Sequence, residues 1–350
     1  MGHGGEMRKR AALLVIAVIC AAAGAIVVHG QATLTTAVAW AYGFVTAGPD
    51  PAPPPCTDTT TPHACARPGR PWPEDGIQLH LPGSDRTFTI AQVQSYFDPA
   101  DWYPADHGPA PDIVLHGREG DDLRACAHCH YHNGMGKPEN GHLAGLPVNY
   151  FLQQMEQFKT GGHQSADPRK ANVAEMIQTA KFMTEAETKA AAEYYASLKW
   201  RQPWVRVVES ETAPKTRQSP AGLFIPLDGK TTEALGQRII EVPENPDATE
   251  RLRDSHSGFV AYVPVGSIAK GKELVTTGGG GKTIACVVCH GMDLTGSGDV
   301  PAIADRTASY NMRQLYNYQQ GARQTMLMKP VVEKLTTDDM IAIVAYLASL

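Results

Sequence analysis

Apolar residues recur at helical spacing in two separate stretches of this chain. In residues 148–160 they fall on one helical face, and Gly161 ends the pattern. A short helix is predicted around residues 171–179. Thr184 and Glu187 form a capping box, which predicts a further helix that runs to residue 198. The first stretch therefore predicts a small bundle of amphipathic helices.

The second stretch lies at the C-terminal end of the chain. Ser267 is placed to cap a helix over residues 267–275, and apolar positions from Met312 onward indicate a helix that ends at Gly321. Thr336 starts the final helix. This stretch predicts a second helical bundle.

Strand character separates the two bundles. Short runs rich in β-branched residues are bounded by turn residues, at positions 205–208, 238–242 and 258–263. A connection of this length is too long to be bare loop, so we expect it to pack against one of the bundles.

The chain begins with an apolar run. Arg8, Lys9 and Arg10 precede residues 11–28, a run of 18 residues that is long enough for a spanning helix. The basic flank predicts a cytoplasmic N-terminus, with the rest of the chain outside. A cleaved signal peptide is the alternative, although its apolar region is usually shorter. We expect an uncleaved single-pass anchor in a bacterial cytoplasmic membrane.

These patterns divide the chain into five segments. They are a signal anchor or transmembrane segment at 1–47, a Pro-rich tether and extension at 48–110, a helical domain at 111–200, an insert at 201–264 and a second helical domain at 265–350.

The composition is that of a globular protein, with 43% apolar and 19% charged residues. The net charge is −5, and no cluster of Lys and Arg indicates nucleic-acid binding. Cys56 and Cys65 lie in a Pro- and Thr-rich loop. In an exported protein they could form a small disulfide, and two free thiols are the alternative.

Each helical domain has the sequence C-x-x-C-H near its beginning. The two copies are Cys126-Ala127-His128-Cys129-His130 and Cys286-Val287-Val288-Cys289-His290. Two thiols one helical turn apart can each form a thioether to a vinyl group of one porphyrin, and the histidine that follows can bind the iron. We therefore predict two covalently bound haem c groups, attached outside the cytoplasmic membrane through Cys126, Cys129, Cys286 and Cys289, with His130 and His290 as iron ligands.

The two domains are copies of one another. They align without gaps for over thirty residues after each motif, so that Tyr150 and Tyr310 both stand 20 positions after their motif histidine. The closing helices also match, with Met183 aligned to Leu335. This indicates a duplicated domain rather than two coincidental motifs.

The duplication also indicates the sixth iron ligands. Met176 stands 7 residues before Met183, and Met328 stands 7 residues before Leu335. A methionine sulfur is a soft ligand that favours Fe(II), so we predict Met176 and Met328 as the axial ligands. Other side chains could take these places: the neighbouring Met183 and Met326 and, for the first iron, His128, His132, His142 or His163.

Residues 126–350 resemble the diheme, two-domain class I cytochromes c. The resemblance rests on the motif early in each half, a Tyr-x-x-x-Gln-x-x-x-[Phe/Tyr]-x-x-Gly helix, the methionine, and a closing helix that ends Ala-Ser-Leu. It implies a mainly α fold with two such domains in tandem, here with an N-terminal transmembrane helix and a short mixed or β insert between the haem domains. Members of the family shuttle electrons in the periplasm or at the membrane, usually from a dehydrogenase or toward a terminal oxidase.

The family pattern is not met everywhere. In the family a proline carbonyl accepts a hydrogen bond from the free nitrogen of the iron-binding histidine. Pro301 matches this proline, whereas Gly141 occupies the aligned position of the first domain. Pro330 follows Met328 as the family prefers, and Met176 has no such proline.

Three functions follow from this reading. The first is a membrane-anchored carrier, not an enzyme, which passes single electrons between respiratory protein partners. The second is a dedicated cytochrome subunit of a membrane dehydrogenase or oxidase complex, motivated by the long extension and insert. The third is a diheme peroxidase, which needs one iron with an open or releasable sixth position.

Overall fold

The computed structural model describes residues 38–44, 76–227 and 230–350. The predicted transmembrane run at 11–28, the first part of the tether, and Cys56 and Cys65 lie outside these residues. In the ranges that are described, no helix combines the length and apolarity needed to cross a bilayer.

The first helical domain follows the predicted pattern. Its helices are α3 (Asp112–Leu115), α4 (Cys126–His130), α5 (Val148–Thr160), α6 (Ala171–Phe182) and α7 (Glu185–Ser197). The prediction for α5 is confirmed, and its last turn is followed by Gly161 at φ 84°, a left-handed conformation that favours glycine. The capping box of Thr184 and Glu187 is also confirmed at the start of α7. Helix α6 runs beyond residue 179, to Phe182.

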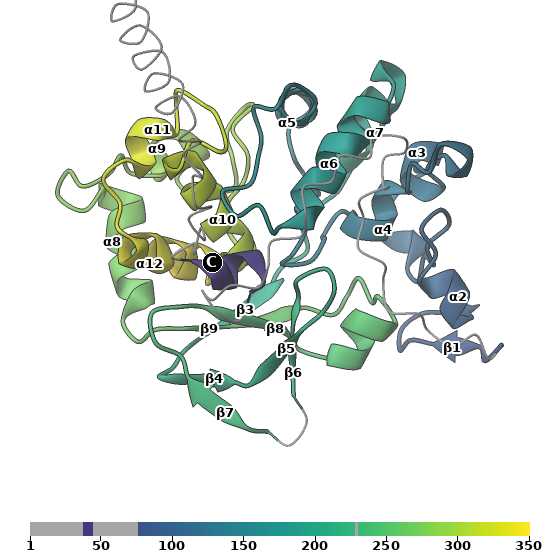
Figure 1. Cartoon of the computed structure of the whole chain (residues 1–350), viewed down its shortest axis with the longest axis horizontal. Coiled ribbons are helices and arrows are strands. Elements are labelled where there is room, and N and C mark those ends of the chain that lie inside the picture. The colour runs from purple at the N-terminus through teal and green to yellow at the C-terminus, as the bar shows by residue number, and fades with distance from the viewer. Residues whose placement is uncertain (1–37, 45–75, 228–229) are drawn as a thin grey trace, which may run out of the picture. The chain divides into compact units, whose positions relative to one another are not determined.

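The second domain has the matching helices (Figure 1). They are α8 (Ser267–Thr277), α9 (Val287–His290), α10 (Ala308–Gln319), α11 (Lys329–Val332) and α12 (Thr337–Ala348). Thr336 forms a capping box with Asp339, as predicted. The prediction that Ser267 caps α8 is wrong, because Gly266 takes the cap position at φ 84° and Ser267 is already helical.

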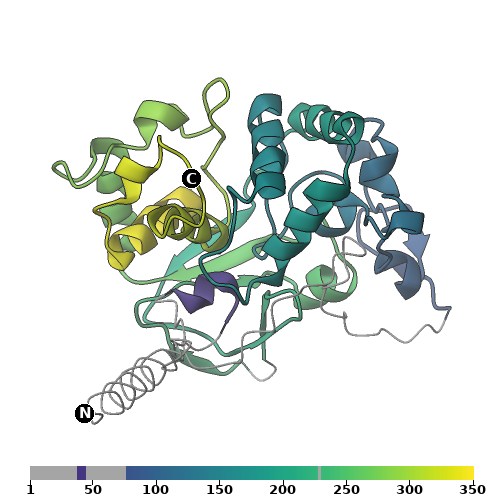
Figure 2. The same ribbon diagram turned by 45° about the horizontal axis from the view of Figure 1, so that its top comes forward.

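The insert contains strands where they were predicted. β3 (Val205–Glu209), β9 (Phe259–Val263) and β8 (Ile240–Pro243) form one sheet in the order β3-β9-β8. β3 runs parallel to β9, and β8 runs antiparallel to it. Two small hairpins pair β4 (Thr212–Pro214) with β7 (Thr232–Ala234) and β5 (Thr216–Gln218) with β6 (Phe224–Pro226). In Figure 2 the green strands lie beneath the helices of both domains.

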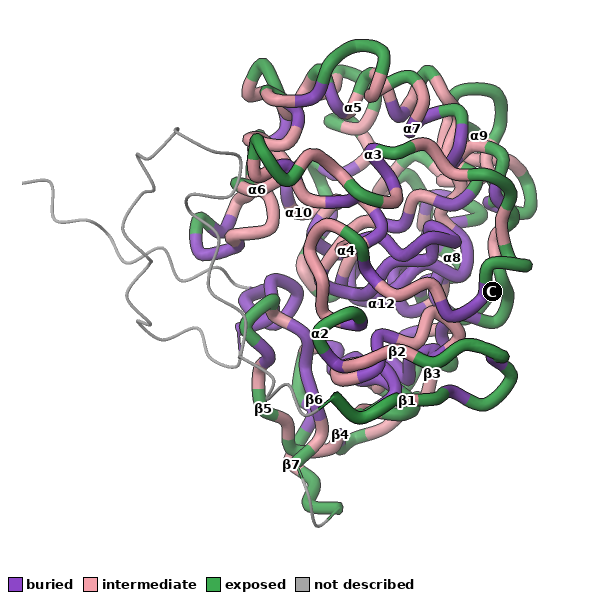
Figure 3. Tube along the Cα trace, turned by 90° about the vertical axis from the view of Figure 1, so that its right-hand side faces the viewer, coloured by how far each residue is buried: buried purple, intermediate pink, exposed green. Residues whose placement is uncertain are grey.

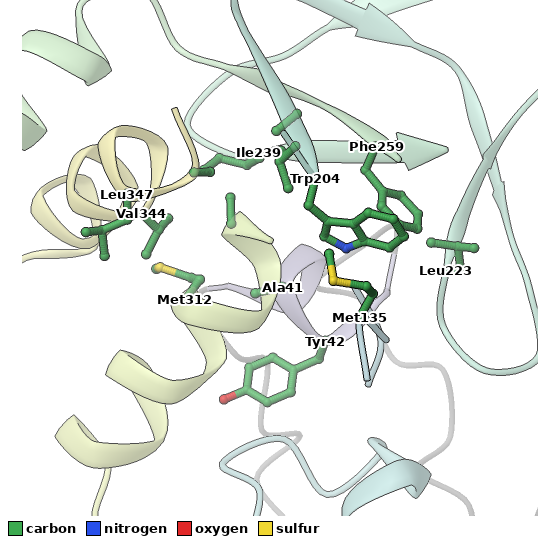
Figure 4. Close-up of a cluster of buried hydrophobic side chains, with 14 of the residues drawn as sticks. Ala41, Tyr42, Met135, Trp204, Leu223, Ile239, Phe259, Met312, Val344 and Leu347 are labelled. Atoms are coloured by element: carbon green, nitrogen blue, oxygen red, sulfur yellow. The ribbon is translucent and has the colours of Figure 1, made fainter. Parts of the chain in front are cut away.

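A continuous hydrophobic core joins the sheet to the second domain. Helix α12 is buried along most of its length, as its purple trace in Figure 3 shows. Figure 4 shows Met312 of α10 and Leu347 of α12 in this core, together with Tyr42 of the short 3-10 helix η1 (Ala39–Tyr42). Trp204 packs edge-on against Phe259, with ring centroids 5.5 Å apart.

The extension before the first domain has its own small core. It contains the hairpin of β1 (Leu79–His80) and β2 (Thr87–Phe88), helix α2 (Ile90–Val93), and the 3-10 helix η2 (Pro104–Asp106). Trp102 is buried, and its indole Nε1 donates to the carbonyl of Leu252 at 2.7 Å. Leu252 follows the short π-helix η4 (Asp247–Arg251) of the insert, so the extension and the insert pack on each other.

Candidate haem sites

The first motif forms the short helix α4, which is followed by a loop that contacts its last residue. His130 is buried, and its Nδ1 lies 2.8 Å from the carbonyl oxygen of Gly141. A carbonyl only accepts hydrogen bonds, so Nδ1 must carry the proton and Nε2 must carry the lone pair. Burial lowers the pKa of His130, which also favours the neutral imidazole. The ring is therefore prepared to bind a metal through Nε2.

The second motif repeats this arrangement. Nδ1 of His290 lies 2.7 Å from the carbonyl oxygen of Pro301, and burial lowers the pKa of His290. The expected proline contact is confirmed, and Gly141 supplies its counterpart in the first domain. The glycine changes the residue type without changing the contact, because the acceptor is a backbone atom.

A cavity lies beside each motif. The first encloses about 1270 Å³ of empty space including its open mouth, and the second about 1580 Å³. Predicted site residues line the first cavity: Cys126, Cys129, His130 and Met176. Their counterparts line the second: Cys286, Cys289, His290 and Met328. The structure thus brings each predicted set together around one cavity.

The competing methionines differ between the domains. Met183 lines the first cavity together with Met176, so both methionines belong to that site. Met326 is 92% exposed and does not belong to the lining of the second cavity. Met328 is therefore the methionine that the structure favours at the second site.

The four histidines that could replace Met176 occupy different places. His163 lines the first cavity, with its Nδ1 3.1 Å from Oε1 of Gln154. His142 lines the second cavity instead, and hydrogen bonds engage both of its nitrogens. His128 and His132 do not line either cavity. The histidine alternative at the first iron therefore narrows to His163.

The residues around the cavities fit haem c. Each cavity joins two thiols on one motif, an imidazole held for metal binding and a thioether, within a mostly apolar lining. Burial raises the pKa of the Cys126 thiol to about 12 and that of the Cys286 thiol to about 11. Arg306, buried in the wall of the second cavity, has an Nη1 without a hydrogen-bond partner among the described residues. Such a donor suits the carboxylates that haem carries.

The wall between the cavities was not predicted from the sequence. Tyr150, Gln154 and Arg323 line both cavities. The aligned Tyr-x-x-x-Gln pattern of the repeat was the available signal for the first two. No signal marked Arg323, because its importance depends on how the two domains meet.

The two motifs differ in how they are covered. At the first, the carbonyl of Ser95 in the extension lies 2.9 Å from Nδ1 of His128, and Arg253 of the insert donates to the carbonyl of His128. At the second, Val288 is 72% exposed and Met292 is 85% exposed. The extension and insert therefore cover the first motif, and the second motif meets solvent through apolar side chains.

Comparison with known proteins identifies the family. The cytochrome c family model matches residues 119–199 and 268–350. A thiosulfate dehydrogenase electron acceptor of Thiomonas intermedia (strain K12) is 26% identical over 234 residues, which cover 65% of this chain and 79% of that protein. Another, from Stutzerimonas stutzeri (strain A1501), is 33% identical over 85 residues, which cover 23% of this chain and 39% of that protein.

A solved structure is also similar. The thiosulfate dehydrogenase of Marichromatium purpuratum has a TM-score of 0.45 and 24% identity, and the match covers 68% of this chain and 39% of that chain. Each region matched by the family model contains its own C-x-x-C-H motif and lines its own cavity. The two helical domains are therefore cytochrome c domains, the domains of a class of electron-transfer proteins, and the chain carries two covalently bound haem c groups.

Proposed function

We propose that this chain is a one-electron carrier held at the outer face of a bacterial cytoplasmic membrane by its N-terminal segment. It accepts electrons from a dehydrogenase and passes them through its two haem sites to a further redox protein. Its role is electron transfer rather than catalysis.

The iron ligands we propose are His130 and Met176 at the first site, and His290 and Met328 at the second. The observation that carries this proposal is that each cavity is lined by an imidazole whose Nδ1 faces a backbone carbonyl and by a methionine. Haem c, when bound, supplies an iron that changes between Fe(III) and Fe(II) by one electron. The protein fixes each histidine tautomer, supplies the soft sulfur and keeps the cavities largely apolar, which together tune the potential.

The shared wall supports electron transfer between the two sites. Residues such as Tyr150 and Tyr310 line both cavities, so a single layer of side chains separates them. Electrons that enter at one site can therefore leave at the other without either site binding a small molecule.

The exposed second motif supports it as the site at which a partner docks. Ile284 and Leu327 line the second cavity and are 45% and 80% exposed. Exposed apolar groups around a redox site suit a transient protein contact. Among the residues that the structure describes, the covered first motif has no such exposed apolar surface.

The names of the relatives support a thiosulfate dehydrogenase as the electron donor. The direct test mixes the oxidised diheme protein with a thiosulfate dehydrogenase and thiosulfate, and follows the haem α-bands by stopped-flow absorbance. We expect both haems to become reduced only when all three components are present. Reduction at the same rate without the dehydrogenase would contradict the proposal.

Binding of carbon monoxide to the reduced haems distinguishes an electron carrier from an enzyme. Carbon monoxide binds ferrous haem only where a ligand position is open. We expect no spectral change when carbon monoxide is added to the reduced protein, and no turnover of hydrogen peroxide. A large change at either haem, together with peroxide turnover, would instead favour the diheme peroxidase.

A dedicated subunit of a membrane dehydrogenase or oxidase complex is the second candidate. It is favoured by the extension and insert, which go beyond what haem binding requires and pack on each other through Trp102 and Leu252. Native gels after gentle solubilisation distinguish the two cases. Migration with a larger complex would favour the subunit, whereas migration as a separate protein would favour the carrier.

A further inference from the structure

The two haem cavities share a wall that contains one charged residue. The residues that line both cavities are Leu146, Tyr150, Gln154, Tyr310, Gln314 and Arg323. The tyrosines and glutamines are pairs related by the internal repeat. Arg323 is the member of this wall that carries a charge.

Arg323 connects the two domains across the wall. Its Nη2 donates to the hydroxyl oxygen of Tyr150 and to Oε1 of Gln154, both at 2.6 Å, and both residues belong to the first domain. Its Nη1 donates to Oε1 of Gln314 in the second domain at 2.7 Å. The backbone adds an isolated β-bridge between Arg323 and His163. The guanidinium is therefore held firmly at the domain junction.

The positive charge of Arg323 is buried, and no carboxylate within residues 38–44, 76–227 and 230–350 forms an ion pair with it. The residue is 4% exposed, and tyrosines rather than acidic residues are the neighbours that influence its ionisation. Its Nε has no hydrogen-bond partner in the described part of the chain. Neutral amide and phenol oxygens accept its hydrogen bonds but do not neutralise it. Because an uncompensated buried charge strongly opposes folding, an anion from another source is expected.

The repeat does not duplicate this charge. The position aligned with Arg323 in the first domain is His163, whose ring stacks on Phe158 with centroids 4.1 Å apart. Arg323 lies over Tyr318 in the same way, 4.6 Å from the ring centroid. At both positions the side chain thus packs on the ring of the aligned aromatic residue, and only the position in the second domain has a permanent positive charge.

We propose that Arg323 is an anion-binding residue shared by the two haem sites, where its guanidinium binds propionate carboxylate of haem c and its charge raises the reduction potential of both haems. Haem c is the source of anions that the two cavities have in common. A fixed positive charge favours the state with one more electron, so it stabilises Fe(II) over Fe(III). This inference rests on the electron-carrier function proposed above.

The test is a spectroelectrochemical titration of the holoprotein and its variants. Arg323→Gln removes the charge and keeps a polar side chain. We expect the ratio of reduced to oxidised haem at a fixed potential to fall about tenfold at both haems, which is about 59 mV for a one-electron couple. Arg323→Lys keeps the charge and should restore most of the loss. If Arg323→Gln yields no holoprotein, Arg323→Met fills similar space and takes its place.

Arg306→Gln is the matched control. Arg306 is also a buried arginine, but it lines the second cavity only. We expect Arg306→Gln to lower the midpoint potential of the second haem only, whereas Arg323→Gln lowers the midpoint potentials of both haems. If Arg323→Gln lowers the midpoint potential of only one haem, Arg323 does not act on both sites and the shared role is overturned. If the folded variant has unchanged midpoint potentials, the whole proposal is overturned. The electron-carrier function is tested separately by carbon monoxide. If neither the variant nor the wild type binds carbon monoxide, failure of the Arg323 proposal leaves the carrier function intact.

Discussion

Replacing Asp305 by alanine should strongly weaken the junction between the second domain and the insert. Asp305 is 1% exposed, and its carboxylate accepts hydrogen bonds from three donors. The indole Nε1 of Trp200 donates to Oδ2 at 2.9 Å, the backbone N–H of Trp204 to Oδ2 at 3.0 Å, and that of Val205 to Oδ1 at 3.2 Å. One side chain thus satisfies the donors where the first domain ends and β3 begins.

The size of the effect follows from these donors. Each buried donor that loses its acceptor costs about 1–3 kcal/mol, and local relaxation recovers part of the sum. Asp305 has φ 51°, and alanine tolerates this left-handed conformation less well than aspartate or asparagine, which adds roughly 1 kcal/mol. We expect Asp305→Ala to lower the free energy of unfolding by about 3–5 kcal/mol.

Asparagine provides the control for Asp305. It keeps one acceptor oxygen and tolerates the left-handed backbone, so we expect Asp305→Asn to cost only about 1–2 kcal/mol. Guanidinium unfolding followed by far-UV circular dichroism measures both, with the haem Soret band recorded in parallel. A loss below about 1 kcal/mol for alanine, or equal losses for the two variants, would refute the reasoning.

Two further substitutions test the second domain. Gly271→Ala should lower the free energy of unfolding by about 2–3 kcal/mol or more, because an added Cβ would clash with the carbonyl oxygen of Ala342 in α12. A melting temperature equal to that of wild type would show that α8 and α12 do not cross so closely. Asp339→Asn should cost about 2 kcal/mol at pH 7, because Asp339 completes the capping box of Thr336 and pairs with Lys270 and Lys282. Burial alone would raise the pKa of Asp339, but the hydrogen bonds from these lysines and from the capping threonine hold it well below its usual value. The stabilisation is therefore complete above the pKa of about 3.9 that an aspartate has in the unfolded chain, and it is lost as the pH falls below this value. Unfolding titrations from pH 7 to pH 2 should show the wild type and Asp339→Asn converging in acid, and a difference that does not depend on pH would contradict this assignment.

Local patterns predicted the helices and the motif chemistry well. The helix α5 could be predicted because its apolar spacing and Gly161 both act within the segment itself. The capping box at Thr184 is similarly local. The cap at Ser267 was predicted wrongly because Gly266, one position earlier, takes the cap at a positive φ that serine adopts less readily.

Features that depend on long-range packing could not be predicted. The cover over the first motif comes from Ser95 and Arg253, which are far from His128 in the sequence. The role of Arg323 depends on its contacts with Tyr150, 173 positions away. No periodicity or motif encodes such contacts, so the asymmetry between the two haem sites emerges only from the fold.

The most direct test of the central claim is near-infrared magnetic circular dichroism of the oxidised protein, in the region of the methionine-to-iron charge-transfer band. The variants are Met176→Ala and Met328→Ala, with matched controls that remove another methionine of each domain, Met183→Ala and Met326→Ala. We expect each of the first two to remove about half of the band, as a duplicated domain requires, and the controls to leave it intact. If Met183→Ala removes the signal, or if Met176→Ala leaves it unchanged, the assignment of the first site is wrong. His163 or an open iron position would then have to explain that site.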